Sequence, residues 1–322
     1  MIALSNETEM HSEERYQRYH RPVLLREVLN YLRPGPGKIF LDGTIGGGGH
    51  TRAFLEAGAE VIGVDQDPEA ISESMSLLLD FASRLTLIRS NFVDITRYLQ
   101  EMDVSGFDGV LIDLGISSHQ LDTPQRGFSF QQSGPLDMRM GPSVPRKASD
   151  LVNYAPEAEL VRIFRAYGEE PAARRIAAEI VRIRVAHPFS TTAELAQAVE
   201  TVLPRRGPRH PATRIFQALR IAVNDELGTI ERALPLLAEQ VKPGGRFAVI
   251  TFQSLEDRLV KQFFRKVTQE WVDRPEWPEP RRNPSFGFRS ITSRPVEPSE
   301  QELADNPRSR SAKLRVIERN LL

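Results

Sequence analysis

The sequence predicts an α/β fold in which a doubly wound, mostly parallel sheet is interrupted by an inserted helical subdomain. Three observations predict it. The first third of the chain alternates short apolar runs with helical patterns, the middle shows helical periodicity alone, and the α/β pattern then resumes. A chain of 322 residues is long enough to bury two cores.

The alternation in the first third predicts the sheet. Buried strands are expected at residues 39–41, 61–64, 85–88 and 110–112. Helices are expected at residues 51–57, 68–81 and 95–102. Strands that alternate with helices pair in parallel, because each helix carries the chain back across one face of the sheet.

The middle of the chain predicts the insertion. Helical periodicity runs through residues 148–203 without a strand pattern, and Thr191 stands where it would cap a helix. The preceding residues 121–140 are rich in Gly, Phe, Asp and Pro and are expected to form an ordered loop. We therefore expect a substrate-recognition domain at residues 121–214. The other domain is expected to be discontinuous, at residues 20–120 and 215–322, after a flexible N-terminal segment at residues 1–19.

The last third returns to mixed patterns. Helices are expected at residues 212–227, 230–240 and 254–269. A turn is expected at residues 242–245, with strands at residues 246–252 and 313–318. Seven prolines between residues 271 and 307 predict a long loop there.

Composition excludes several classes of protein. The chain has no cysteine, which excludes disulfides, thiolate metal sites and a cysteine nucleophile, and no metal is expected. Residues 1–19 are polar and acidic, without the apolar core of a signal peptide, and no apolar run is long enough to span a bilayer. The expected location is therefore cytoplasmic, and no membrane partner is expected.

Charge is unevenly distributed along the chain. Residues 39–122 carry four arginines against fourteen acids, whereas residues 139–220 carry fourteen bases against eight acids. A basic middle region suits a phosphate-rich substrate, and a solvated surface of uneven charge is the alternative.

A glycine-rich turn between the first strand and the first helix predicts a nucleotide cofactor. It runs from Asp42 to His50 and contains Gly46, Gly48 and Gly49. Glycines let the backbone approach a ligand, and Asp65, at the end of the second strand, is placed to accept hydrogen bonds from ribose hydroxyls. A dinucleotide-binding fold uses similar parts, and a purely structural turn is the simplest alternative.

Two features of this turn favour S-adenosylmethionine over a dinucleotide. The turn departs from the G-x-G-x-x-G spacing of dinucleotide sites, and Asp42 suits a cationic methionine group better than a pyrophosphate. Asp113 ends the fourth strand, at the edge of a doubly wound sheet where ligands bind; a helix cap is its alternative role.

Several long motifs can then be considered together. They are H-R-P-V-L-L from His20, D-G-T-I-G-G-G-G-H-T from Asp42, D-L-G-I-S-S-H-Q-L-D from Asp113, R-G-F-S-F from Arg126, G-P-L-D-M-R-M from Gly134, H-P-A-T-R from His210, Q-A-L-R-I from Gln217, S-L-E-D-R from Ser254 and N-P-R-S-R from Asn306. The set closely resembles the bacterial RsmH family, also called MraW, from about residue 20 to residue 319.

The resemblance implies a Rossmann-like methyltransferase domain interrupted by a helical domain. It implies an enzyme, a 16S rRNA (cytosine-N4)-methyltransferase, that uses S-adenosylmethionine to methylate the N4 amine of cytosine 1402 in the small ribosomal subunit. The partner would be 16S rRNA or the small subunit, and the oligomeric state is not predicted. Matching positions for the cofactor fall on Gly48, Gly49, His50, Asp65, Phe92, Asp113 and Gln120, with Gly46 in the same turn. Phe92 would lie near the adenine or in the core.

The sequence departs from the family in two places. Gln253 precedes S-L-E-D-R where the family usually has histidine, so an obligatory imidazole base there is doubtful. Ser133 and Gly141 flank G-P-L-D-M-R-M where the family tends to have acids, which leaves Asp137 as the better candidate in that loop.

The N4 amine of cytosine is a poor nucleophile, because its lone pair is delocalised into the ring. An acceptor must polarise its N–H bonds, and Asp113 or Asp137 is expected to be this catalytic residue. The missing cysteine opposes methylation at C5, whose usual route is covalent attack at C6.

RNA contacts are expected from the basic insertion. Arg126 and Arg139 would meet phosphates, while Phe128 and Phe130 would stack on an extruded base or anchor the loop. His210 and Arg214 would position RNA or pack a helix start. Alternative functions are methylation of another RNA base or a protein amine, and a non-catalytic RNA-binding ribosome assembly factor.

Overall fold

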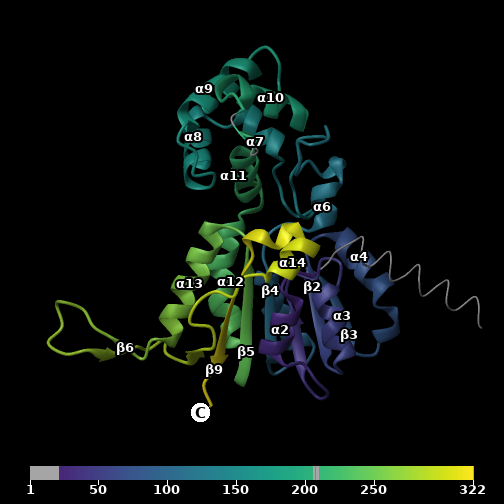
Figure 1. Cartoon of the computed structure of the whole chain (residues 1–322), viewed down its shortest axis with the longest axis vertical. Coiled ribbons are helices and arrows are strands. Elements are labelled where there is room, and N and C mark those ends of the chain that lie inside the picture. Colours follow the sequence, from purple (N-terminus) through teal and green to yellow (C-terminus); the bar gives the residue numbers. More distant parts are fainter. Residues whose placement is uncertain (1–21, 206, 208–209, 322) are drawn as a thin grey trace, which may run out of the picture. The chain divides into compact units, whose positions relative to one another are not determined.

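The structure is a computed structural model that describes residues 22–321 apart from 206, 208 and 209. The segment at residues 1–19, expected to be flexible, lies outside these residues. Internal contacts divide the chain into two compact units (Figure 1). The first comprises the described residues up to Gly115 and from Leu227 onward, and the second is Ile116–Glu226.

A seven-stranded sheet forms the centre of the first unit, in the order β3-β2-β1-β4-β5-β9-β8. The strands are β1 (Ile39–Asp42), β2 (Glu60–Asp65), β3 (Leu85–Arg89), β4 (Phe107–Asp113), β5 (Val241–Thr251), β8 (Phe288–Ser290) and β9 (Lys313–Arg319). Strands β1 to β5 are parallel, and β9 runs antiparallel to both β5 and β8. This confirms the Rossmann-like α/β fold. The order reverses between β1 and β4, where ligands bind in such sheets.

Helices cover both faces of this sheet. They are α2 (Leu25–Leu32), α3 (Gly49–Glu56), α4 (Pro68–Leu77), α5 (Ile95–Glu101), α12 (Glu226–Glu239) and α13 (Ser254–Thr268), while the short helix α14 (Glu300–Asp305) belongs to the same unit. One apolar core joins α5, α12 and α13 to the sheet, and another joins α2 and α3 to its opposite face. The short 3₁₀ turns η1 (Leu79–Phe81), η2 (Phe92–Asp94) and η4 (Pro307–Ser311) complete the unit.

Two expectations about the last third were wrong in detail. Residues 242–245 are not a turn ahead of the strand but lie within β5, where Val241 faces Phe107 and Arg246 faces Gly109, so the residues between them bulge out of the pairing. The segment 271–307 is not all loop. It contains β6 (Trp271–Val272), β7 (Arg281–Arg282), β8 and α14, which are too short to show an apolar period.

The second unit is helical. It contains α6 (Ser118–Asp122), η3 (Pro124–Arg126), α7 (Ala148–Tyr154), α8 (Glu157–Ala166), α9 (Ala173–Arg184), α10 (Thr192–Val202) and α11 (Thr213–Asn224). As expected, Thr191 caps α10, since its side chain accepts from the N–H of Glu194. In the part of the chain that the structure describes, no helix is long and apolar enough to cross a membrane.

The second unit extends further than residues 121–214. It begins at Ile116 and ends at Glu226, because α11 buries Ile215, Phe216 and Leu219 in the helical core. Apolar periodicity shows that such a helix has a buried face, but not which core that face joins.

Candidate cofactor and substrate sites

The glycine-rich turn connects the end of β1 to the start of α3. Gly46 and Gly48 have φ of 52° and 79°, a left-handed conformation that glycine adopts without strain. A Cβ on Gly48 would lie 2.9 Å from Cδ1 of Leu78, so a side chain at this position would also require Leu78 to shift. The Ser74 hydroxyl donates to the carbonyl of Gly46 (2.9 Å), which ties the turn to α4.

Asp65 ends β2 and holds the same turn through its carboxylate. Its Oδ2 accepts from the N–H of Gly46 (3.0 Å), and its Oδ1 accepts from the N–H of Asp67 (2.9 Å). Each carboxylate oxygen has a second lone pair, so Asp65 can still accept hydrogen bonds from ribose hydroxyls. One carboxylate therefore orders the loop and is available to a ligand.

Asp42 and Asp113 end the neighbouring strands β1 and β4. Asp42 accepts from the Thr51 hydroxyl (2.7 Å) and from the N–H of Thr44 (3.2 Å). The Thr44 hydroxyl in turn accepts from the N–H of Asp113 (2.7 Å). The Asp113 side chain is 11% exposed, and its buried Oδ1 has no hydrogen-bond partner in the described part of the chain. Its alternative role as a helix cap is wrong, because Ser117 caps α6.

The three carboxyl groups at this edge of the sheet are buried close to one another's charge and lack a lysine or arginine partner among the described residues. Burial raises the pKa of Asp42 to about 6, against hydrogen bonds from Thr51 and Thr44. Burial likewise raises the pKa of Asp65 to about 6. The pKa of Asp113 lies well above its usual value, first because of burial and then because of the charges of Asp42 and Glu256. Within the described residues, no lysine or arginine forms an ion pair with any of the three.

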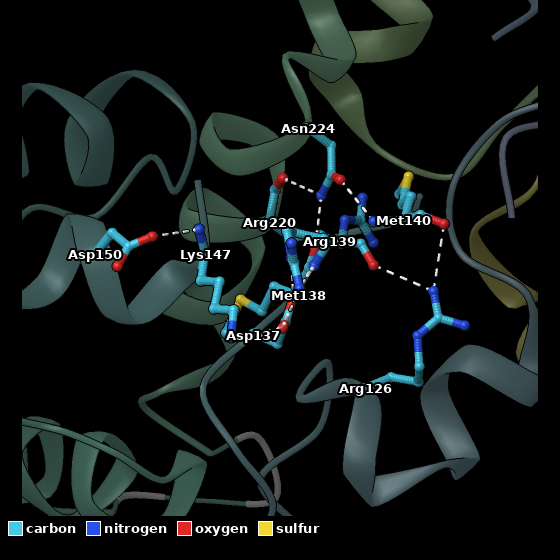
Figure 2. Close-up of polar contacts among 9 residues, drawn as sticks. All are labelled: Arg126, Asp137, Met138, Arg139, Met140, Lys147, Asp150, Arg220 and Asn224. Carbon is cyan, nitrogen blue, oxygen red and sulfur yellow. Dashed lines mark hydrogen bonds and ion pairs between the residues drawn. The ribbon is translucent and has the colours of Figure 1, made fainter. Parts of the chain in front are cut away.

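The segment 126–140 of the second unit forms a tightly bonded loop, which Figure 2 shows around Asp137. The Arg139 guanidinium donates to both oxygens of Asp137, from Nε at 2.7 Å and from Nη2 at 2.9 Å. Lys147 Nζ lies 3.7 Å from Asp137 Oδ2. Burial raises the pKa of Asp137, but hydrogen bonds and charge from Arg139, with Lys147, outweigh it and leave that pKa below its usual value.

Comparison with known proteins identifies the family. The MraW methylase family model matches residues 17–320. The chain belongs to the MraW methylase family. It is 49% identical to the ribosomal RNA small subunit methyltransferase H of Syntrophotalea carbinolica over 93% of this chain and 98% of that one. The same-named proteins of Heliobacterium modesticaldum (47%; 94% and 98% covered) and Geobacter sulfurreducens (49%; 93% and 98% covered) are similarly close.

As a member of this methylase family, the protein is a methyltransferase with S-adenosylmethionine as its methyl donor. The edge of the sheet fits this cofactor. S-adenosylmethionine carries a cationic sulfonium and ammonium, and the buried carboxylates of Asp42, Asp65 and Asp113 form no ion pair with a lysine or arginine among the described residues. The anionic pyrophosphate of a dinucleotide would be repelled by the same groups. Both the charge of this edge and the family therefore oppose the alternative of a dinucleotide-binding site.

The remaining cofactor candidates of this MraW methylase divide between the units. His50, in the first turn of α3, is 4% exposed; its Nε2 donates to the carbonyl of Val23 (2.9 Å), while Nδ1 lies 4.0 Å from Asp113 Oδ2. Phe92 packs against the sheet core in η2, and its Cβ would lie 3.2 Å from a Cβ on Gly43. Gln120 belongs to the second unit, where it completes the capping box of α6 with Ser117. Their contacts with the cofactor stay predictions.

Glu256 is the residue of this edge that sequence reasoning missed. It is 1% exposed, and its Oε2 accepts from the N–H groups of Phe252 (2.9 Å) and Gln253 (3.3 Å). The Gln253 side chain donates to Oε1 (2.7 Å), so the residue that replaces the family's usual histidine helps to begin α13. The sequence signal that could have found Glu256 is the Gln-x-x-Glu spacing of Gln253 and Glu256, which is typical of a capping box at a helix start.

The RNA candidates of the loop make contacts within the second unit. Phe128 is 6% exposed. The Phe130 ring packs edge-to-face against Phe216 (centroids 4.8 Å apart) and at a tilt against His210 (4.5 Å), which is the loop-anchoring alternative expected from the sequence. Arg126 donates from Nη2 to the carbonyls of Arg139 (3.1 Å) and Met140 (3.3 Å). These three side chains hold the loop in place.

His210 and Arg214 also have partners of their own. The N–H of Ala212 donates to His210 Nδ1 (3.1 Å), so Nε2 carries the proton that faces Glu200 (2.8 Å). Arg214 Nη1 lies 3.6 Å from Glu170 Oε2, and 43% of the Arg214 side chain is exposed. His210 therefore serves the start of α11, whereas the Arg214 side chain stays partly exposed, and its contact with RNA stays a prediction.

Asp42 predicts a measurable dependence of stability on pH. Its pKa is higher in the folded chain than in the unfolded one, so its contribution to folding is complete below pH 4 and is lost as the pH rises through 6. The loss amounts to about 3 kcal/mol. We expect the ligand-free wild type to lose this much more stability between pH 4 and pH 7 than an Asp42→Asn variant does, as measured by denaturant unfolding. Parallel pH profiles for the two proteins would show that Asp42 is not the titrating group.

Proposed function

We propose that this methyltransferase modifies the N4 amine of cytosine 1402 in the 16S rRNA of the small ribosomal subunit. The observation that carries the proposal is nearly half identity, over almost the whole of each chain, to several proteins named ribosomal RNA small subunit methyltransferase H. The basic composition of residues 139–220 supports a phosphate-rich substrate. Since ribosomal subunits are in the cytoplasm, we also place the enzyme there.

We assign the cofactor to the edge formed by β1, β2 and β4. Gly46, Gly48 and Gly49 form the turn that brings the backbone to it at the start of α3, Asp65 faces its ribose, and Asp42 and Asp113 offset its positive charge. His50, Phe92 and Gln120 are further proposed contacts. The cofactor supplies a methyl group on a cationic sulfur, and the protein's own groups must orient and activate the amine.

Asp113 is the better of the two candidate acceptors for the amine proton. Its Oδ1 has no hydrogen-bond partner among the residues that the structure describes, and a carboxylate with a raised pKa holds a proton more strongly than an ordinary one. Asp137 is less suitable, because Arg139 occupies both of its oxygens and its pKa is lowered. Asp113 would polarise the N–H bonds, so that the nitrogen lone pair becomes available as the proton leaves.

The experiment that tests this function uses labelled S-adenosylmethionine. We expect small ribosomal subunits that lack the modification to take up one methyl group per 16S rRNA, and digestion to nucleosides to yield N4-methylcytidine from position 1402. If the label is found at another base, the assignment to position 1402 is wrong. If the label is found in ribosomal protein, the substrate is protein and not RNA. No transfer to any component, with cofactor binding intact, would favour a non-catalytic assembly factor.

A further inference from the structure

The turn Asp137–Met140 is held by a residue far away in the sequence. Asn224, the last residue of α11, donates from Nδ2 to the carbonyl of Met138 (2.8 Å) and accepts at Oδ1 from the N–H of Met140 (2.8 Å). The same amide donates to the carbonyl of Arg220 (2.9 Å), which fixes the side chain on its own helix (Figure 2). One side chain thus joins α11 to both flanks of Arg139.

The backbone of this turn needs such support. Met138 has φ of 62°, a left-handed conformation that costs a residue other than glycine about 1–2 kcal/mol. The N–H of Met138 donates to the carbonyl of Arg126 (3.0 Å), and the Arg126 guanidinium donates to the carbonyls of Arg139 and Met140. Strain that is kept by converging hydrogen bonds is typical of functional turns.

The result of this arrangement is a guanidinium with a fixed orientation. Asp137 occupies Nε and Nη2 of Arg139, whereas Nη1 makes no hydrogen bond among the described residues. The Arg139 side chain is 30% exposed. Residues 139–147 contain three bases and no acid, so Arg139 begins a basic stretch of the sequence. A guanidinium edge with two free N–H groups fits phosphate oxygens.

We propose that the free edge of Arg139 binds a backbone phosphate of the RNA substrate, and that Asn224 is the positioning residue that presents it. The inference rests on the proposed function, since it takes RNA as the substrate. It gives Asp137 the role of orienting Arg139 in place of a catalytic one. Asn224 touches no reacting atom and acts only through the turn.

The chain provides a matched control for the test. Asn153 lies in the same unit and makes the same pair of amide bonds, donating to the carbonyl of Phe189 (2.8 Å) and accepting from its N–H (2.8 Å). Asn224→Ala and Asn153→Ala therefore each remove one bond to a distant backbone carbonyl and one from a distant backbone N–H, and Asn224→Ala also removes the bond to Arg220 on its own helix. Only the first removes contacts with the turn that carries Arg139.

The experiment measures methyl transfer to small ribosomal subunits by the full-length enzyme. We expect Asn224→Ala and Arg139→Ala each to raise KM for the subunit about tenfold, with kcat and the Kd for S-adenosylmethionine changed less than about twofold. Arg139→Ala should also reduce the slope of log affinity against log salt concentration by about one. The double variant should be no worse than Arg139→Ala alone, because Asn224 acts through Arg139.

Three outcomes would overturn the inference. They are an equal change of KM in Asn153→Ala, additive effects in the double variant, and an unchanged salt dependence in Arg139→Ala. Thermal unfolding of all variants shows whether each one folds. If Arg139→Ala disturbs the loop, Arg139→Lys is the second variant, because it keeps the positive charge and removes the guanidinium edge. Failure of the proposed function gives a different result, in which the wild type itself transfers no methyl group to RNA.

Discussion

Replacing Asp113 with asparagine is expected to lower kcat for methyl transfer at least about 100-fold. The asparagine keeps the shape of the side chain but cannot take up a proton from the amine. The backbone N–H that donates to Thr44 is retained, so the turn and the strand end should stay in place. Single-turnover transfer to small ribosomal subunits, with the enzyme saturated with cofactor, measures the chemical step directly.

The matched control for this prediction is Asp108→Asn, on the same strand. Asp108 lies near the opposite end of β4, where Oδ2 accepts from the N–H of Ile39 (3.0 Å) and pairs with Lys242 (2.9 Å). Its loss removes an equal charge from β4 without altering the cofactor edge. If the Asp113→Asn enzyme keeps near wild-type turnover, Asp113 does not accept the amine proton, and Asp137 is the remaining candidate.

Replacing Asp65 with alanine is expected to weaken binding of S-adenosylmethionine about 10- to 100-fold. The change removes the proposed acceptor of the ribose hydroxyls. It also frees the N–H of Gly46, so the glycine-rich turn loses a bond that orders it. Isothermal titration calorimetry at pH 7.5, where Asp65 is ionised, gives the dissociation constant.

Glu60→Ala provides the comparison for Asp65→Ala. Glu60 begins β2 and is exposed, at the end of the strand opposite Asp65. We expect its loss to leave cofactor affinity within about twofold of wild type, as for most exposed sites. If Asp65→Ala binds the cofactor as tightly as Glu60→Ala, the ribose does not lie at the end of β2.

The sheet and its charged edge could be predicted because their signals are local. The apolar runs of β1, β2 and β3 coincide with the observed strands to within one or two residues at each end. Asp42, Asp65 and Asp113 directly follow or end such runs, and the carboxyl ends of parallel strands lie on one edge of a sheet. The three acids at these strand ends could therefore be predicted to lie along one edge of the sheet.

The parts that escaped prediction depend on contacts between distant segments. Asn224 and Met140 are 84 residues apart, and neither has a sequence neighbourhood that indicates the other. The residue types at 242–245 predict a turn, but the pairing of β5 with β4 makes these residues a bulge within the strand. Likewise the contacts of Arg126 depend on the left-handed Met138, and a methionine gives no sign of that conformation.

The insertion of the helical unit determines the order in which the chain can fold during synthesis. Strand β5, the neighbour of β4 in the middle of the sheet, begins at Val241, after the whole of Ile116–Glu226. The nascent chain therefore holds every residue of the helical unit while the outer edge of β4 still has no partner. An open edge of this kind invites pairing with other chains. We expect chains that stop shortly after residue 226 to aggregate through β4, although their helical unit is complete.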